Sequence, residues 1–80
     1  MIKYSKEAEK FILSQGKAIA LRVYNAAEKL PLGDVKRLQG TKKPQLYRLR
    51  VGDYRIVFYY DSDKITILRV DNRGDVYKRI

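Results

Sequence analysis

The sequence predicts an α+β fold in which an N-terminal strand and an antiparallel helical hairpin precede a curved antiparallel β-sheet. Apolar residues recur at helical spacing in the first part of the chain, whereas from Gln45 onward they alternate as in strands. Short turn sequences separate the strand-like runs. Eighty residues are enough for one small hydrophobic core, so we expect a single domain over residues 1–80.

The N-terminal segment predicts a short edge strand followed by a helix. Ile2–Tyr4 alternates apolar and polar residues, and Ser5 can cap a helix by accepting a backbone N–H bond. Glu7 and Glu9 then fall near the positive end of the helix dipole. The helix is expected to end at Gly16. Its apolar stripe consists of Ala8, Phe11 and Ile12.

A second helix is predicted from about Lys17 to Leu30, ended by Pro31 and Gly33. Its apolar face consists of Ala20, Val23, Tyr24, Ala27 and Leu30. The short link between the two helices favours an antiparallel hairpin, and both apolar stripes are interpreted as core.

Residues Leu32–Pro44 are interpreted as a basic loop, with Leu32, Val35 and Leu38 as its anchors in the core. Strands are expected at residues 45–51, 54–60 and 64–71. The Gly52-Asp53 dipeptide between the first two predicts a two-residue hairpin with a type II′ turn.

This turn fixes the hairpin register and therefore the side chains on each face. The pairs expected on the core face are Val51 with Tyr54, Leu49 with Ile56, and Tyr47 with Phe58. The other face carries Arg50 opposite Arg55 and Arg48 opposite Val57, with Tyr59 beside them. Facing arginines repel each other, so a stable sheet does not require this arrangement. The pattern therefore favours a phosphate clamp with a stacking surface over a merely solvated polar face.

The third strand is less informative. Ile65 and Ile67 are expected on one face, and Thr66, Leu68 and Val70 on the other. This register places Arg69 on the core face, for which the sequence offers no reason.

Composition narrows the possible chemistry. The chain has no cysteine and no histidine, which excludes disulfides and thiolate catalysis and argues against a zinc site, so no cofactor is expected. No stretch is long and apolar enough for a membrane span or a signal peptide, so we expect a soluble cytoplasmic protein without a membrane partner.

The net charge of +9 favours a polyanionic partner, either nucleic acid or an acidic protein. The positive charge is concentrated: no acid lies between Asp34 and Asp53. The basic residues of that segment are Lys36, Arg37, Lys42, Lys43, Arg48 and Arg50.

Three segments together resemble the RelE/ParE toxin superfamily. They are Leu46–Phe58, the tail Asn72–Tyr77, and the upstream Asp34–Gly40. With the helical hairpin in front of them, the resemblance covers essentially the whole chain. It implies an N-terminal strand, two antiparallel helices and a curved sheet with a concave basic face.

The resemblance also implies an activity. RelE-type members of toxin–antitoxin systems cleave messenger RNA in the ribosomal A site and so inhibit translation. Their basic sheet residues correspond to Arg48, Arg50 and Arg55, and their terminal pair to Arg73 and Tyr77. It further implies a cognate antitoxin protein as partner, with operator DNA bound only through the antitoxin complex. Many relatives have His where this chain has Asn72, which argues against a histidine-dependent mechanism.

Metal-independent RNA cleavage needs a base for the 2′-OH, positive charge on the phosphate and a donor for the leaving oxygen. Tyr77 is the candidate base, since nearby arginines would stabilise its phenolate. Arg48 and Arg55 are expected to hold the phosphate, and Arg73 to neutralise the leaving oxygen. The expected RNA-binding residues are Lys42, Lys43, Arg50 and Tyr59.

Other functions remain open at this point. A ParE-type toxin would share the fold and act on DNA gyrase, and a non-catalytic RNA-binding or protein-interaction module would keep the basic face without needing Tyr77. A DNA-binding regulator is disfavoured because neither helix concentrates basic residues as a recognition helix does.

Overall fold

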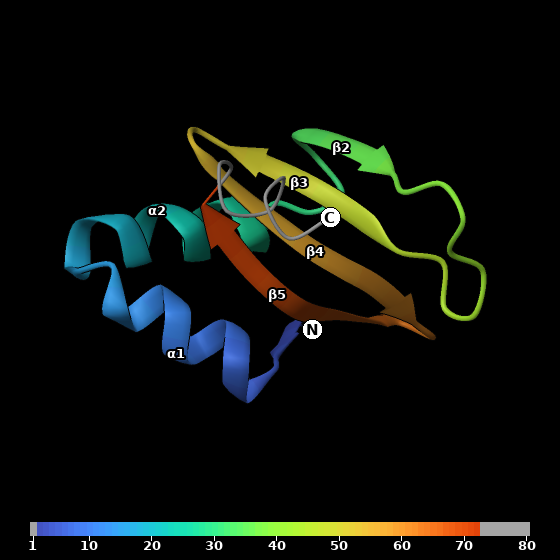
Figure 1. Ribbon diagram of the computed structural model, residues 1–80, viewed down its shortest axis with the longest axis horizontal. Helices are drawn as coiled ribbons and strands as arrows, with labels where there is room; N and C mark the ends of the chain where they lie inside the picture. Colours follow the sequence, from blue (N-terminus) through green and yellow to red (C-terminus); the bar gives the residue numbers. More distant parts are fainter. Residues whose placement is uncertain (1, 73–80) are drawn as a thin grey trace.

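The computed structural model describes residues 2–72, so the predicted site residues Arg73 and Tyr77 lie outside the described part of the chain. The elements follow in the order β1 (Ile2–Tyr4), α1 (Lys6–Ser14), α2 (Lys17–Glu28), β2 (Asp34–Arg37), β3 (Tyr47–Val51), β4 (Tyr54–Asp61) and β5 (Lys64–Asn72), as Figure 1 shows.

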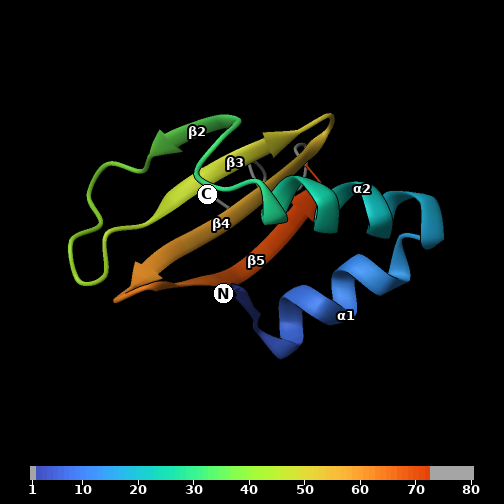
Figure 2. The ribbon, with the colours of Figure 1, turned by 180° about the vertical axis from the view of Figure 1, so that it is seen from behind.

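The strands form one twisted sheet in the order β1-β5-β4-β3-β2. Neighbouring strands from β2 to β5 are antiparallel, whereas β1 lies parallel to β5 at the edge. Both helices lie on one side of the sheet, which we call the helix-covered face (Figure 2). The opposite side, which carries no helix among residues 2–72, is called the open face. The predicted α+β class, with a strand and two helices ahead of the sheet, is confirmed.

The start of α1 is anchored to β5 through Ser5. As predicted, Ser5 Oγ caps the helix by accepting the backbone N–H of Ala8 at 3.0 Å. The same hydroxyl donates to the carbonyl of Leu68 at 2.7 Å, and the Ser5 N–H donates to the carbonyl of Ile67 at 2.9 Å. The cap therefore fixes α1 against the edge of β5 that β1 leaves unpaired.

The core lies between the helices and the sheet, and the predicted apolar stripes supply it. Its buried residues are Ala8, Ile12, Ala20, Val23, Leu49, Ile56, Phe58, Ile67 and Val70. Phe58 is fully buried, with Tyr47 stacked at a ring-centroid distance of 5.6 Å. Burying one such large side chain stabilises the fold by about 1.5–3 kcal/mol relative to leaving it in water.

The β3–β4 hairpin has the predicted register. Tyr47 pairs with Phe58, Leu49 with Ile56, Arg50 with Arg55, and Val51 with Tyr54. Gly52 has a φ of +59°, the left-handed value that the first position of a type II′ turn requires. A Cβ there would also lie 2.9 Å from Arg22 Nη2, so the turn packs closely against α2.

The segment predicted as a loop contains a strand, and the prediction was wrong there. β2 pairs antiparallel with β3, with Val35 opposite Leu49. Val35 packs against the core as expected, whereas Leu32 is 71% exposed and anchors nothing. A four-residue edge strand with one inward apolar side chain leaves only a weak alternation in the sequence.

A β-bulge changes the expected face of Arg69. The β4–β5 register shifts between Val57 and Phe58, so that Val57 pairs with Arg69 and Phe58 with Ile67. Leu68 is the extra residue. The bulge brings Ile67 and Val70 to the same side, where both are buried, and turns Arg69 to the open face. The predicted faces for Val70 and Arg69 were therefore wrong, because strict alternation does not hold across a bulge.

Candidate nucleic-acid interface

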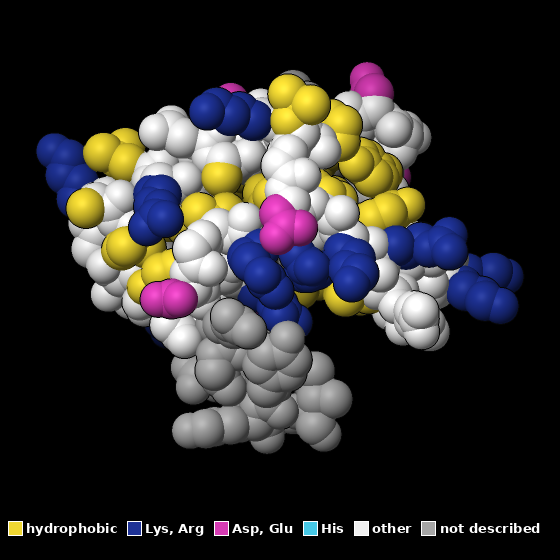
Figure 3. Space-filling model, turned by 90° about the horizontal axis from the view of Figure 1, so that it is seen from above, with side chains coloured by type: hydrophobic (Ala, Val, Ile, Leu, Met, Phe, Trp, Pro, Cys, Tyr) yellow, Lys and Arg dark blue, Asp and Glu magenta, His cyan; other side chains and the backbone are white. Residues whose placement is uncertain are grey.

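The open face gathers charged side chains from four strands. By register and alternation they are Asp34 and Lys36 from β2, Arg48 and Arg50 from β3, Arg55 from β4, and Arg69 and Asp71 from β5. Figure 3, which looks onto the β2 side of the molecule, shows Lys and Arg side chains clustered around an acidic one. Five cations against two carboxylates leave the face positive.

Arg48, Arg50 and Arg55 share this face, as the hairpin register predicted. Arg50 and Arg55 are cross-strand partners. Repulsion between two solvated like charges in such a pair destabilises the sheet by a few tenths of a kcal/mol. Nearby carboxylates from the two neighbouring strands offset this repulsion. Asp34 is the register partner of Arg50, and Asp71 is the register partner of Arg55.

Arg48 is the most buried of the basic residues, with a side chain that is 10% exposed. Its Nη1 donates a hydrogen bond to the main-chain carbonyl of Asp34 at 3.1 Å. The same nitrogen lies 3.5 Å from Asp34 Oδ1. Arg48 thus ties β3 to the edge strand β2 as well as contributing charge.

Arg50 is more accessible, with a side chain that is 40% exposed. Its Nε lies 3.9 Å from Asp34 Oδ2, at the long end of ion-pair distances. Asp34 therefore contacts both arginines of β3. Asp34 was not among the site residues predicted from the sequence, although it precedes the acid-free segment and the short Asp-Val-Lys-Arg alternation would place it beside Lys36.

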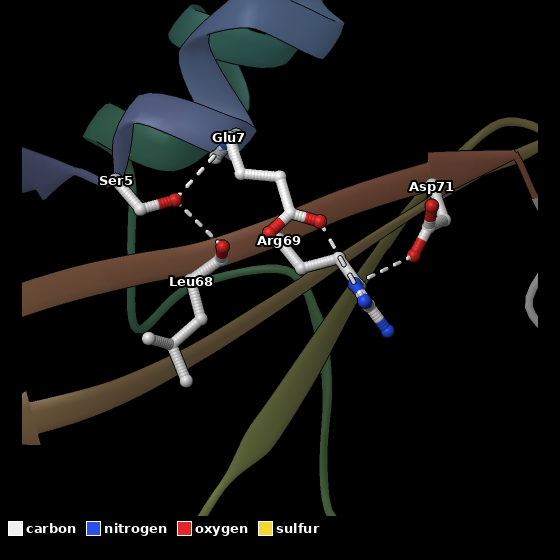
Figure 4. Close-up of polar contacts among 6 residues, drawn as sticks. Ser5, Glu7, Leu68, Arg69 and Asp71 are labelled. Carbon is white, nitrogen blue, oxygen red and sulfur yellow. Dashed lines mark hydrogen bonds and ion pairs between the residues drawn. The ribbon is translucent and has the colours of Figure 1, made fainter.

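Arg69 links the sheet to the first helix. Its Nη2 lies 3.6 Å from Glu7 Oε1 of α1, and its Nε lies 3.3 Å from Asp71 Oδ2 (Figure 4). Asp71 is buried, so this ion pair is less screened by solvent than the contacts of Asp34. Arg69 therefore bridges a carboxylate of α1 and a carboxylate of β5 in a structural ion-pair network.

The remaining predicted RNA-binding residues lie in two places, one on the open face and one on a loop. Tyr59 follows Val57 by two residues, which places it on the open face, where it is half-buried. Lys42 and Lys43 are exposed on the loop between β2 and β3, which extends away from the helices (Figure 1). The structure brings the arginines of β3 and β4 together but leaves these lysines apart from them on the loop.

Two further features of the described residues bear on function. Within residues 2–72, the carboxylates form no group of three or more that could hold a metal ion. No helix in this part of the chain is long and apolar enough to span a membrane.

Two solved structures with the same fold come from toxin–antitoxin complexes. The chain is similar to archaeal RelE in its RelE–RelB complex from Pyrococcus horikoshii, with 32% identity, a TM-score of 0.73, and coverage of 91% of this chain and 93% of that one. It is also similar to a chain of the RelB–RelE antitoxin–toxin complex from Methanococcus jannaschii, with 26% identity, a TM-score of 0.69, and coverage of 98% of both chains.

A third similar structure supports the fold alone. It is a conserved hypothetical protein, HP0894, from Helicobacter pylori, with 19% identity, a TM-score of 0.62, and coverage of 91% of this chain and 93% of that one. No match was found among curated proteins.

The two helices on one side of the sheet and the arginines on the other thus define a small basic α+β protein with the RelE fold. The family model described as the ParE toxin of type II toxin–antitoxin systems, parDE, matches residues 2–77. The chain belongs to this RelE/ParE family of toxins.

Proposed function

We propose that this toxin is a RelE-type endoribonuclease that cleaves messenger RNA on the ribosome. The observation that carries the proposal is the clustering of Arg48, Arg50 and Arg55 on the sheet face opposite the helices. Asp34 and Asp71 offset only part of this charge, since the face carries five cations against two carboxylates, and a polyanionic partner would neutralise the excess. Arginine suits this role because its planar fork binds phosphate oxygens in pairs and stays charged at any physiological pH.

In the proposed mechanism, the RNA 2′-OH attacks the adjacent phosphorus and leaves a 2′,3′-cyclic phosphate. Tyr77 takes the proton of the 2′-OH, Arg48 and Arg55 hold the phosphate, and Arg73 neutralises the leaving 5′ oxygen. None of these groups is an efficient acid or base near neutral pH. The reaction therefore needs a substrate that is already well positioned, as messenger RNA is in the ribosomal A site.

RNA contacts beyond the reacting phosphate are assigned to Arg50, Tyr59, Lys42 and Lys43. Arg50 and the two lysines are exposed cations, and Tyr59 offers a ring for stacking against a base. The two archaeal structures similar to this chain are complexes with RelB antitoxins. We accordingly assign the chain a cognate antitoxin in the cytoplasm, through which alone it would reach operator DNA.

A ParE-type activity on DNA gyrase is the second candidate, because the matching family model is described by the ParE toxin. With this second function, the basic face would bind a protein surface rather than RNA. It assigns no chemical step to Tyr77.

Primer extension on messenger RNA after brief induction of the toxin, with and without translation, separates the two. An RNA endonuclease of this type gives new 5′ ends only on translated messages. Growth arrest without such ends, accompanied by loss of gyrase supercoiling activity in vitro, would reject the proposal in favour of the gyrase target.

A further inference from the structure

Asp34 contacts both arginines of β3, so a phosphate that contacted the same nitrogens would take the place of its carboxylate. Its Oδ1 is 3.5 Å from Arg48 Nη1, and its Oδ2 is 3.9 Å from Arg50 Nε. One anion thus presents two oxygens to two guanidinium groups. A phosphodiester, with its two non-bridging oxygens, can make the same contacts.

The carboxylate is held loosely in this position. Both distances exceed the 2.7–2.9 Å typical of charge-assisted hydrogen bonds. The Asp34 side chain is also 57% exposed, so water and salt screen its attraction for the arginines. Turning this carboxylate toward solvent therefore costs little.

Arg48 does not depend on the carboxylate for its orientation. Its hydrogen bond goes to the main-chain carbonyl of Asp34, which β2 holds in place through its pairing with β3. When the Asp34 side chain turns away, Arg48 keeps this anchor, and the nitrogen that faced the carboxylate can contact a phosphate oxygen instead. Asp71 on β5 differs in this respect, because it is buried beside Arg69 and cannot move aside as easily.

We propose that Asp34 is an internal competitor for the phosphate position at Arg48 and Arg50, which RNA displaces when it binds. The inference rests on the proposed function for the identity of the natural anion. The Asp34 carboxylate lowers the affinity of this position and so weakens the hold of the isolated toxin on RNA. Substrates positioned by other contacts overcome the competition.

The test compares Asp34→Asn with Asp63→Asn. Both substitutions remove one negative charge, but Asp63 lies in the exposed β4–β5 turn, away from the arginines of β3. The probe is a single-stranded RNA with 2′-O-methyl riboses, which cannot be cut by its own 2′ oxygen, and binding is followed by fluorescence anisotropy. Asp34→Asn should bind about two- to fivefold more tightly than wild type at low salt, the fold-change that a surface ion pair is worth.

High salt should remove the gain because the competing contacts are solvent-exposed. Asp63→Asn should bind as wild type does. An equal gain in both variants would show a net-charge effect and overturn the inference. Weaker binding by Asp34→Asn would also overturn it, because Asp34 would then hold the arginines in position for RNA. Thermal melts of both variants establish that they are folded.

Inorganic pyrophosphate, titrated by calorimetry, separates this inference from the proposed function. Tighter pyrophosphate binding by Asp34→Asn in a chain that binds no RNA would support the competed anion position and reject the RNA substrate. If the substitution strengthens binding of neither probe, the competition does not exist.

Discussion

The two faces of the sheet differ in what holds their side chains in place. On the helix-covered face, Leu49, Ile56 and Phe58 are at most 2% exposed and interlock with the helices. On the open face, Arg50 and Asp34 are held together by one contact of 3.9 Å between partly exposed groups. Close packing stabilises the helix-covered face, whereas repulsion between like charges on the open face lowers the stability of the fold. Stability and activity should therefore respond to different substitutions.

The largest expected effect is on activity. Tyr77→Phe keeps the aromatic ring and removes only the proposed base. Cleavage should fall by roughly 10²- to 10⁴-fold, the usual contribution of a positioned proton acceptor, and growth arrest should disappear. Primer extension after induction measures the cleavage, and denaturant unfolding should show unchanged stability. Full toxicity with cleavage still present would remove Tyr77 from the mechanism.

On the helix-covered face, Phe58→Ala should have the largest effect on stability. It removes a fully buried ring and leaves a cavity among Leu49, Ile56 and the neighbouring Tyr47. The free energy of unfolding should fall by about 3–5 kcal/mol. Urea denaturation followed by circular dichroism measures the change. A loss below about 1 kcal/mol would mean that the core is far more tolerant than its burial indicates.

Arg50→Ala tests the reverse case on the open face. Stability should change by less than about 0.5 kcal/mol, because the substitution removes a weak ion pair together with the repulsion from Arg55. RNA binding should weaken, and the slope of log affinity against log salt should become shallower by roughly 0.7. The wild-type slope should be at least about two units if three arginines engage phosphates. A nearly flat wild-type slope would instead indicate a protein target.

The last prediction concerns alkaline stability. Tyr4 of β1 packs edge-to-face on Tyr24 at 5.2 Å, and burial, with Glu28 and Tyr24 adding to it, raises the pKa of Tyr4 to about 12. Between pH 10 and 12 the unfolded chain therefore ionises Tyr4 while the folded chain keeps it neutral, so stability falls as pH rises. Tyr4→Phe should lose less stability than wild type between pH 9 and pH 11 in urea unfolding. Parallel pH dependence of the two proteins would contradict the assignment.

Much of the fold was predictable because local signals agreed with one another. The Gly52-Asp53 turn set the hairpin register, and the register set the faces of Arg48 and Arg50. Ser5 correctly predicted the start of α1, because capping depends on neighbouring backbone groups. In each case the interactions that determine the local structure lie within a short segment of the sequence.

The errors have non-local causes. The bulge at Leu68 belongs to the pairing of β4 with β5, so counting alternation along β5 alone put Arg69 on the wrong face. Strand β2 exists because β3 offers it an edge, which four residues around Val35 do not reveal. Asp34 was missed for the same reason, since its importance comes from its neighbour across the strand pair.

The parallel pairing of β1 with β5 has a consequence for how the chain folds during its synthesis. Ile2 can pair with Ile65 only after the ribosome has synthesised β5, and Ser5 at the start of α1 hydrogen-bonds to Leu68 of the same strand. Contacts so distant in sequence form late, because the long intervening loop must close first. A nascent chain that stops before β5 cannot complete the sheet or the core, to which Ile67 and Val70 of β5 contribute. A toxin built in this way stays unassembled for most of the time that its own ribosome is translating it.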